Sequence, residues 1–186
     1  NNWSADVIPL IADETFLRIS EQQTQYLWRY GVGQLMSKSM SGAVAVSQLC
    51  EEWARPYLKT EYRIVHPCID DEKHRLLSDV SPSYTFNESP RILHAGTVSD
   101  RAAVEKKNVN RLSQVVSNSN GWQLRLLGRG HDQFEYSMLS GVEALGYLED
   151  LSSFVAEFEE ANVYVQPSVG DAFPVASLEA MLAGIP

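Results

Sequence analysis

Cysteine, long apolar runs and, over the last third of the chain, basic side chains are all scarce in this sequence. Only two of the 186 residues are cysteine, Cys50 and Cys68, and they do not form a CxxC pair. This argues against a disulfide framework or a zinc site. No apolar run approaches the roughly 18–20 residues of a membrane helix, and the first 30 residues do not resemble a signal peptide. We therefore expect a cytoplasmic protein.

The charge of the chain is negative overall and unevenly distributed. Fifteen Lys and Arg residues against 24 Asp and Glu residues give a net charge of −9, which argues against nucleic-acid binding. Residues 91–130 carry seven basic side chains and two acids, whereas residues 131–186 carry ten acids and no Lys or Arg. A basic segment in an acidic protein suits a small anionic ligand, but it equally suits a solvated helix face, and charge leaves both open.

Short apolar runs that end in Gly, Pro or a capping residue alternate with helical patterns along the chain. This alternation indicates a parallel sheet with helices on both faces, in which ligands bind at the carboxyl ends of the strands. A polar, irregular stretch over 70–90 is typical of a linker. We predict strands at 42–47, 62–66, 92–95, 124–127, 142–145 and 163–166, and helices at 20–30, after Ser47 with Leu49, Trp53 and Tyr57 on one face, from about Lys107, from Asp150 and from Pro174.

Both ends of the sequence suggest a piece of a longer protein. The chain starts with Asn1 rather than Met, and it stops at Pro186, directly after an apolar helix and the helix-stop residue Gly184. An alternating α/β chain would continue with another strand at this point.

Residues 167–186 form the most informative segment. Pro174 is placed like the first residue of a helix, and the small residues before it let backbone N–H groups near Phe173 face a ligand. A helix N-terminus attracts phosphate or carboxylate. Asp171 and Glu179 could flank one polyhydroxylated ligand, or they could simply be a loop acid and a solvated acid. We expect the buried stripe of the helix to contain Val175, Leu178, Met181, Leu182 and Ile185.

This segment, DAFPVASLEAMLAGIP over 171–186, resembles the EX7E signature of retaining glycosyltransferases of the GT-B fold, group 1 (family 4). Further pieces resemble the family in the same order along the chain. They are HPCID at 66–70, Gly96 followed by Lys107-Asn108, LLGRG at 126–130, GYL at 146–148 and ANVYVQPS at 161–168. Each piece is weak alone, but six in order make the resemblance strong over roughly residues 41–186.

The resemblance implies an α/β fold made of Rossmann-like units. Residues 1–70 would be the C-terminal part of the N-terminal, acceptor-side Rossmann-like domain, and 71–90 the linker. Residues 91–186 would be the donor-binding Rossmann-like domain, a parallel sheet with helices on both faces, truncated at its C-terminus. The implied activity is that of a hexosyltransferase, which transfers a sugar from a nucleotide-sugar to an acceptor with retention of anomeric configuration.

Carried over position by position, the resemblance implies that Asp171 and Lys107 are catalytic. Glu179 would accept hydrogen bonds from the donor ribose, Lys107 would pair with the diphosphate, and Asp171, shorter than the usual Glu, would face the donor sugar. Thr97 stands where the family usually has Arg, and Arg101 could substitute for it. The implied donor-binding set is Gly96, Thr97, Arg101, Lys107, Gly128, Tyr147, Leu148, Ala172, Phe173, Pro174, Ser177, Leu178 and Glu179.

Within that set, the amides around residues 172–174 would line the sugar, although Pro174 itself has no N–H. The amides near Ser177 and Leu178 would line the diphosphate, and residues 146–148 would contact the base. The developing charge of the nucleoside diphosphate would be stabilised by Lys107 and by the helix N-terminus near Val175.

The resemblance also implies that no metal or other cofactor is needed. The partner would be a nucleotide-sugar donor, with an unidentified glycan, lipid or small-molecule acceptor and no nucleic acid, in the cytoplasm, with peripheral membrane contact left open. The family's usual catalytic His belongs to the N-terminal domain, so this chain alone would bind donor without transferring sugar. Two alternatives stay open: a sugar-nucleotide epimerase, and a non-catalytic nucleotide-binding module, which the departures at Thr97 and Asp171 favour.

Overall fold

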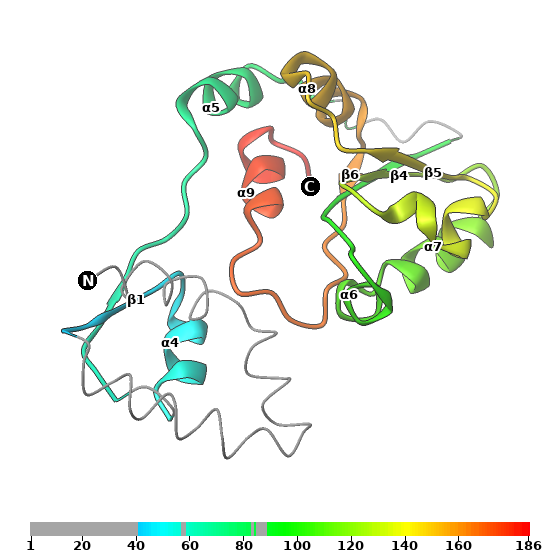
Figure 1. Ribbon diagram of the computed structural model, residues 1–186. Coiled ribbons are helices and arrows are strands. Elements are labelled where there is room, and N and C mark those ends of the chain that lie inside the picture. The colour runs from blue at the N-terminus through cyan, green and yellow to red at the C-terminus, as the bar shows by residue number, and fades with distance from the viewer. Residues whose placement is uncertain (1–40, 57–58, 83, 85–88) are drawn as a thin grey trace. The chain divides into compact units, whose positions relative to one another are not determined.

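The computed structural model describes residues 41–186 apart from 57–58, 83 and 85–88, and in these residues the chain divides into two compact units (Figure 1). The first unit contains the chain up to Cys68 together with Asp171–Phe173, and the second contains Ile69–Gly170 and Pro174–Pro186. The predicted helix at 20–30, like Tyr57, lies outside the described residues. The predicted division at residues 70 and 90 stays a prediction.

The described residues of the first unit form two parallel strands and one helix. Strands β1 (Ala43–Ala45) and β2 (Tyr62–Ile64) pair in parallel, and helix α4 (Gln48–Ala54) connects them. The Ser47 hydroxyl caps α4, accepting a hydrogen bond from the Cys50 amide at 3.2 Å, as the sequence predicts. The buried face of α4 carries Cys50 and Ala54, whereas Leu49 is 40% exposed. The expectation that Leu49 belongs to the apolar face is therefore wrong.

The second unit contains a four-stranded parallel sheet in the order β5-β4-β3-β6. Its strands are β3 (Arg91–Ala95), β4 (Gln123–Leu127), β5 (Val142–Gly146) and β6 (Val163–Tyr164). The chain moves outward from β3 to β4 and β5, and then returns to the other side of β3 to form β6. This reversal between β3 and β6 is a topological switch point, where open α/β sheets bind their ligands.

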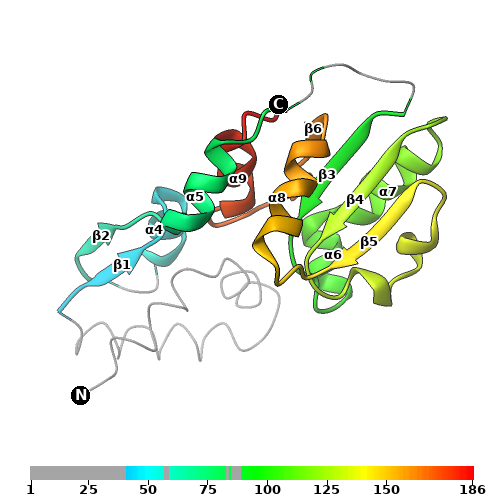
Figure 2. The same cartoon turned by 90° about the horizontal axis from the view of Figure 1, so that it is seen from above.

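Alternating side chains of the strands bury two separate cores, one on each face of the sheet. Figure 2 shows helices on both of these faces. Leu93, Ala95 and Leu127 point to the face that is covered by α5 (Asp71–Ser78), α8 (Leu151–Glu160) and α9 (Val175–Leu182). Ile92, Leu124 and Leu126 point to the face covered by α6 (Arg101–Lys107) and α7 (Val109–Ser117). The predicted parallel sheet with helices on both faces is confirmed.

Two helices occupy segments that the sequence predicts to be irregular. Helix α5 lies in the stretch expected to be a linker, where the Asp70 carboxylate caps it by accepting from the Lys73 amide at 2.9 Å. Helix α6 lies between the predicted strand at 92–95 and the helix predicted from about Lys107, where no element is predicted, and the Asp100 carboxylate caps it in the same way. Both helices are strongly polar and bury few residues, chiefly Leu77 in α5 and Val104 in α6, so no apolar stripe marks them in the sequence.

The connection from β4 to β5 has no α-helix. It contains two short 3-10 helices, η1 (His131–Gln133) and η2 (Glu135–Met138). The buried side chains of these turns are His131 and Tyr136, which pack beside α7 on its face of the sheet. These turns place a histidine under the end of β3.

Helix α9 ends where the sequence predicts, but it buries a different face. Gly184, at φ +72°, ends it: the Gly184 amide donates to the Met181 carbonyl and the Ile185 amide to the Ala180 carbonyl, the pair of bonds of a Schellman motif. Ala180 and Ala183 are buried, whereas Met181 is 72% exposed. The expected stripe is therefore wrong at Met181, because small residues let α9 pack closely against α5.

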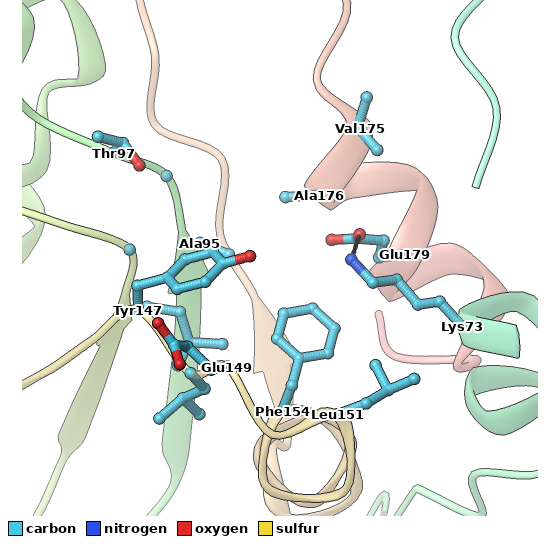
Figure 3. Close-up of a pocket in the computed structure, with 14 residues that line it drawn as sticks. Lys73, Ala95, Thr97, Tyr147, Glu149, Leu151, Phe154, Val175, Ala176 and Glu179 are labelled. Atoms are coloured by element: carbon cyan, nitrogen blue, oxygen red, sulfur yellow. Dashed lines mark hydrogen bonds and ion pairs between the residues drawn. The ribbon is translucent and has the colours of Figure 1, made fainter. Parts of the chain in front are cut away.

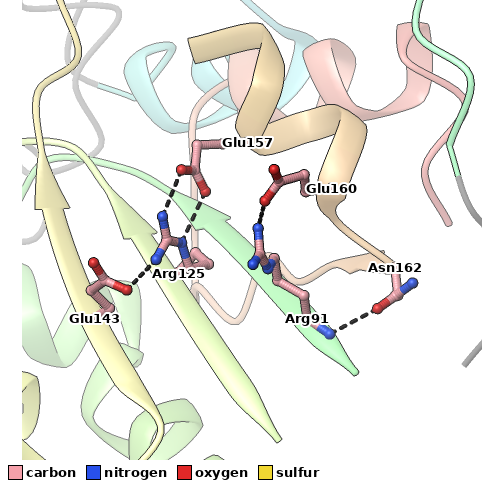
Figure 4. A network of polar contacts seen from close by, with 6 residues as sticks. All are labelled: Arg91, Arg125, Glu143, Glu157, Glu160 and Asn162. Atoms are coloured by element: carbon pink, nitrogen blue, oxygen red, sulfur yellow. Dashed lines mark hydrogen bonds and ion pairs between the residues drawn. The ribbon is translucent and has the colours of Figure 1, made fainter. Parts of the chain in front are cut away.

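Toward the amino ends of the strands, two arginines of the sheet pair with glutamates of α8 (Figure 4). The Arg125 guanidinium donates to both oxygens of Glu157, at 2.9 and 2.7 Å, and also pairs with Glu143 of β5. These hydrogen bonds and charges raise the pKa of Arg125 above its ordinary value. Arg91 pairs with Glu160, and its amide donates to the Asn162 side chain at 2.8 Å.

Among the described residues, no helix is both long enough and apolar enough to span a membrane.

Candidate functional site

A cavity of about 340 Å³ opens at the carboxyl ends of β3, β4 and β5, at the switch point of the sheet (Figure 3). Its volume lies within the usual range of small-molecule sites. Its walls come from six parts of the second unit: the ends of the three strands and the beginnings of α5, α8 and α9. The lining residues are Lys73, Ala95, Gly96, Thr97, Leu127, Gly128, Tyr147, Leu148, Glu149, Leu151, Phe154, Val175, Ala176 and Glu179.

The floor of the cavity is made of backbone. Gly96 follows β3 and donates its amide to the Leu127 carbonyl at 2.9 Å, while Gly128 follows β4 and donates to the Gly146 carbonyl at 2.8 Å. Gly128 has φ +115°, and a β-carbon there would lie 2.3 Å from the Gly96 carbonyl oxygen. The two strand ends can approach this closely only because residue 128 is glycine.

His131 supports this floor from below. Its Nε2 lies 2.6 Å from the Gly96 carbonyl oxygen, and its Nδ1 lies 2.9 Å from the Tyr136 hydroxyl. Burial lowers the pKa of the imidazole and raises the pKa of Tyr136 to about 12. A neutral ring satisfies both contacts, because Nε2–H donates to the carbonyl while Nδ1 accepts from the phenol. His131 is therefore a buried structural residue.

The N-terminus of α9 forms the upper wall. Pro174 is the N-cap rather than the first helical residue, and helix residues begin at Val175. The amides of Val175 and Ala176 lie in the first turn, where N–H groups have no partner within the helix, and both residues line the cavity. The amide of Ser177 donates to the Pro174 carbonyl at 3.0 Å. The Ser177 amide, which the resemblance implies lines the diphosphate, therefore makes a hydrogen bond within its own helix turn.

Glu179, one turn further along α9, is only 6% exposed and forms an ion pair with Lys73. The Lys73 ammonium donates to Glu179 Oε1 at 2.8 Å and lies 4.6 Å from the centre of the Phe154 ring. All three residues line the cavity. The solvated acid that was an open alternative for Glu179 is excluded, because this carboxylate is buried and paired.

Tyr147 forms the open rim of the cavity. Its side chain is 60% exposed, and the guanidinium of Arg129 lies 4.8 Å from its ring centre, a cation–π contact. Figure 3 shows the ring leaning over the cavity, across from Glu179 on α9. A planar group could stack here at the edge of the site.

The structure brings six of the predicted residues together around the cavity: Gly96, Thr97, Gly128, Tyr147, Leu148 and Glu179. Five others belong to the same unit but do not line the cavity: Arg101, Lys107, Pro174, Ser177 and Leu178. Their roles, like those of the lining residues, stay predictions.

Lys107 is the last residue of α6 rather than an early residue of the following helix. A left-handed turn at Asn108, φ 57°, separates α6 from α7. The helix predicted from about Lys107 therefore begins after it, and Lys107 instead ends a helix, where a cation is favourable. Its Cε lies 3.7 Å from the position that a β-carbon on Gly96 would occupy, so its side chain ends beside the cavity floor.

Asp171, Ala172 and Phe173 group with the first unit. The Phe173 amide donates to the Asp171 carboxylate at 3.3 Å, and the Phe173 ring stacks on His66 at 5.2 Å between ring centres. The amide that the sequence predicts to face a ligand is therefore engaged within its own loop.

Lys73 is the charged partner of Glu179 in the cavity, and it is not among the predicted site residues. It lies 106 positions before Glu179, in the stretch interpreted as a linker. A signal for its helix does exist: Asp70 at the cap position precedes two acids, Asp71 and Glu72, in the first turn. Nothing in the sequence pairs it with Glu179.

Across the described part of the chain, no three His, Cys, Asp or Glu side chains gather where they could hold a metal ion. That the reaction needs no metal ion stays a prediction.

The chain was compared with protein families, with curated sequences and with solved structures. Residues 89–186 match the family model described as glycosyl transferases group 1. No curated protein sequence matches the chain. Among solved structures, sucrose-phosphate synthase from Thermosynechococcus elongatus aligns with a TM-score of 0.67 at 18% identity, covering 94% of this chain and 47% of that one.

Two further structures share the fold. Anabaena HepE, solved in complex with UDP and glucose, has a TM-score of 0.59 at 16% identity, with 89% of this chain and 48% of that chain covered. TarM has a TM-score of 0.58 at 14% identity, with 81% and 29% covered. The chain thus spans at most about half the length of these structures, which share its GT-B architecture.

Proposed function

The chain belongs to the group 1 glycosyltransferases, and on this basis we propose that the cavity of its second unit binds the nucleotide-sugar donor of a hexosyl-transfer reaction that retains anomeric configuration. The observation that carries the proposal is the buried Glu179 carboxylate in the wall of the cavity, next to the N-terminus of α9. A carboxylate accepts hydrogen bonds, so it suits the hydroxyl groups of a ribose.

The diphosphate of the donor would bind at the N-terminus of α9. The Val175 and Ala176 amides, in the first turn of a helix at the cavity wall, would donate to its oxygens, and the positive end of the helix dipole would add to them. The Lys107 side chain, which ends beside Gly96, supplies a full positive charge near the floor. The base would lie against Tyr147 at the rim.

Catalysis would follow from where charge develops. When the bond between sugar and phosphate breaks, the leaving nucleoside diphosphate gains negative charge, and fixed donors placed beforehand stabilise that charge most effectively. We propose the α9 amides and Lys107 for this role, and Asp171 as the residue that faces the donor sugar. The acceptor would be bound by parts of the protein outside the second unit, and sugar transfer would require them.

A nucleotide panel tests this proposal. Thermal unfolding of the 186-residue chain would be measured with UDP, GDP, ADP, CMP, UDP-glucose and GDP-mannose, with Glu179→Gln as the variant and Glu159→Gln, an exposed acid of α8, as its matched control. A ligand present at ~100 times its dissociation constant adds ~2.7 kcal/mol to the unfolding free energy. We expect one base to stabilise the parent and Glu159→Gln, but not Glu179→Gln.

UDP is the first probe, because HepE was solved with UDP and glucose. If the folded parent binds no member of the panel, the donor-site proposal is wrong and a non-catalytic module becomes the better interpretation. If Glu179→Gln binds as well as the parent, the ligand lies elsewhere.

A further inference from the structure

We propose that Lys73 is a positioning residue for nucleotide recognition: it holds the Glu179 carboxylate in the orientation that accepts the ribose hydroxyls and compensates its charge. The inference rests on the proposed function of the cavity. It assigns a role to helix α5, which lies before the residues 89–186 that match the family model.

The geometry fixes the carboxylate at one of its two oxygens. Oε1 of Glu179 accepts from the Lys73 ammonium at 2.8 Å, and among the described residues Oε2 has no hydrogen-bonding partner. Figure 3 shows this second oxygen directed toward the space between α9 and Tyr147. A carboxylate held by one oxygen has its remaining acceptor positions facing a cavity, which is the arrangement that a pair of hydroxyl donors requires.

The ammonium is itself held from a second side. The Lys73 side chain is 28% exposed, and its ammonium lies 4.6 Å from the centre of the Phe154 ring, where the negative face of the ring attracts it. Because Phe154 belongs to α8 and Glu179 to α9, one lysine of α5 links the three helices that cover this face of the sheet. Because the Lys73 side chain is held at two points, it has less conformational freedom, and the position of the Glu179 carboxylate is better defined.

Charge gives a second reason for a lysine at this position. A nucleoside diphosphate is strongly anionic, and an unpaired buried carboxylate in the same cavity would repel it. Lys73 cancels that charge inside the cavity wall. Residues 131–186, which include Glu179, contain ten acids and no Lys or Arg. The cation that pairs with Glu179 must therefore come from another part of the chain. Removing one partner of such a pair leaves the other charge buried and uncompensated.

The experiment distinguishes a Lys73 that orients the Glu179 carboxylate from a Lys73 that only packs in the cavity wall. It uses two forms of each nucleotide that differ only in the ribose. Dissociation constants would be measured for UDP, GDP and ADP and for the 2′,3′-dideoxy form of each. The variants are Lys73→Met, Lys73→Arg, Glu179→Gln and the double variant of Lys73→Met with Glu179→Gln. Arg75→Met is the matched control, since Arg75 is an exposed cation on the same helix and does not line the cavity.

For the nucleotide that binds, we expect Lys73→Met to weaken the ribose form roughly tenfold, the usual effect of losing one charge-assisted hydrogen bond. The dideoxy form should weaken less, so that the ratio of the two dissociation constants falls toward one. Lys73→Arg should restore most of the ratio, and Arg75→Met should leave it unchanged. In the Glu179→Gln background, Lys73→Met should change the ratio no further, because it acts through Glu179.

An unchanged ratio in Lys73→Met would overturn the inference, even if both forms bind more weakly. Wild-type binding by Glu179→Gln would instead refute the proposed function of the cavity, as would a folded parent that binds no nucleotide, so the two failures are distinguishable. Urea unfolding of every variant checks folding. If Lys73→Met does not fold, Lys73→Gln replaces it, because glutamine retains a hydrogen-bond donor without the charge. We then expect a ratio of the two dissociation constants between those of Lys73→Arg and Glu179→Gln.

Discussion

Two sets of carboxylate and cation pairs lie on the same face of the sheet, and they differ in what surrounds them. Toward the amino ends of the strands, the Arg125 guanidinium uses both oxygens of Glu157 and also pairs with Glu143, while Arg91 pairs with Glu160. At the carboxyl ends, Lys73 uses one oxygen of the buried Glu179, and both residues line a cavity.

The two sets differ in whether their carboxylates line a cavity. In the arginine network both oxygens of Glu157 accept from Arg125, while Glu143 and Glu160, each paired through one oxygen, are 60% exposed to solvent and do not line the cavity. In the lysine pair, hydrogen-bonding capacity faces a cavity beside a helix N-terminus. We infer that the arginine network contributes to stability alone, whereas the lysine pair contributes to recognition.

The largest expected effect concerns the backbone floor that makes the cavity end different. Gly128→Ala should lower the unfolding free energy by about 3 kcal/mol or more, because a β-carbon at φ +115° would meet the Gly96 carbonyl at 2.3 Å. Gly146→Ala is the control: its φ is +72°, but nothing lies within 4 Å, so only backbone strain of about 1 kcal/mol is expected. Urea unfolding measures both. Equal losses would contradict the close approach of the two strand ends.

The second prediction tests the arginine network directly. Arg125→Met should lower the unfolding free energy by about 2 kcal/mol, because it leaves the largely buried Glu157 without its two hydrogen bonds. The dissociation constant for the nucleotide should not change. Lys73→Met should instead change the dissociation constant for the nucleotide more than the unfolding free energy. A loss of nucleotide affinity in Arg125→Met would break the distinction between the two sets of pairs.

The third prediction concerns pH and the histidine beneath the floor. Because burial lowers the folded-state pKa of His131 below its ordinary value of 6.5, the unfolded chain takes up the proton first as pH falls. The stability that neutral His131 contributes is therefore fully present above pH 6.5 and is lost below it, with a slope of at most about 1.4 kcal/mol per pH unit. His131→Gln should reduce this slope. An unchanged slope in the variant would assign the pH dependence to other groups.

The smallest expected effect is on the opposite face of the sheet, where Ser113 of α7 is fully buried and, among the described residues, its hydroxyl has no hydrogen-bonding partner. Ser113→Ala should leave stability unchanged or raise it by up to about 1 kcal/mol, since it removes a polar group whose burial is uncompensated. Ser153→Ala is the informative contrast, because the Ser153 hydroxyl donates to the Asp150 carboxylate at 2.6 Å. Destabilisation by Ser113→Ala would mean that its hydroxyl has a bonding role.

Much of the fold could be predicted because its signals are local. All six predicted strands in the described residues are present, and the caps Ser47 and Asp150 and the stop at Gly184 depend on neighbours within a few positions. Helices α5 and α6 were missed because polar helices that bury few side chains carry little periodic signal.

The rest depends on contacts between distant segments. Local spacing favours Met181 for the buried stripe of α9, yet Ala180 and Ala183 are buried because α5 packs against that helix. The pairing of Lys73 with Glu179 joins residues 106 positions apart, and no local pattern could reveal it. The position of Lys107 was misjudged for a related reason, since its helix, α6, has no apolar stripe.

The most direct test of the central claim is a crystal structure of the chain with the nucleoside diphosphate that binds best in the panel. The account predicts the ribose hydroxyls at Glu179, with the Lys73 pair intact, and the diphosphate at the amides of Val175 and Ala176. A nucleotide bound outside this cavity, or bound in it with its ribose away from Glu179, would contradict the account.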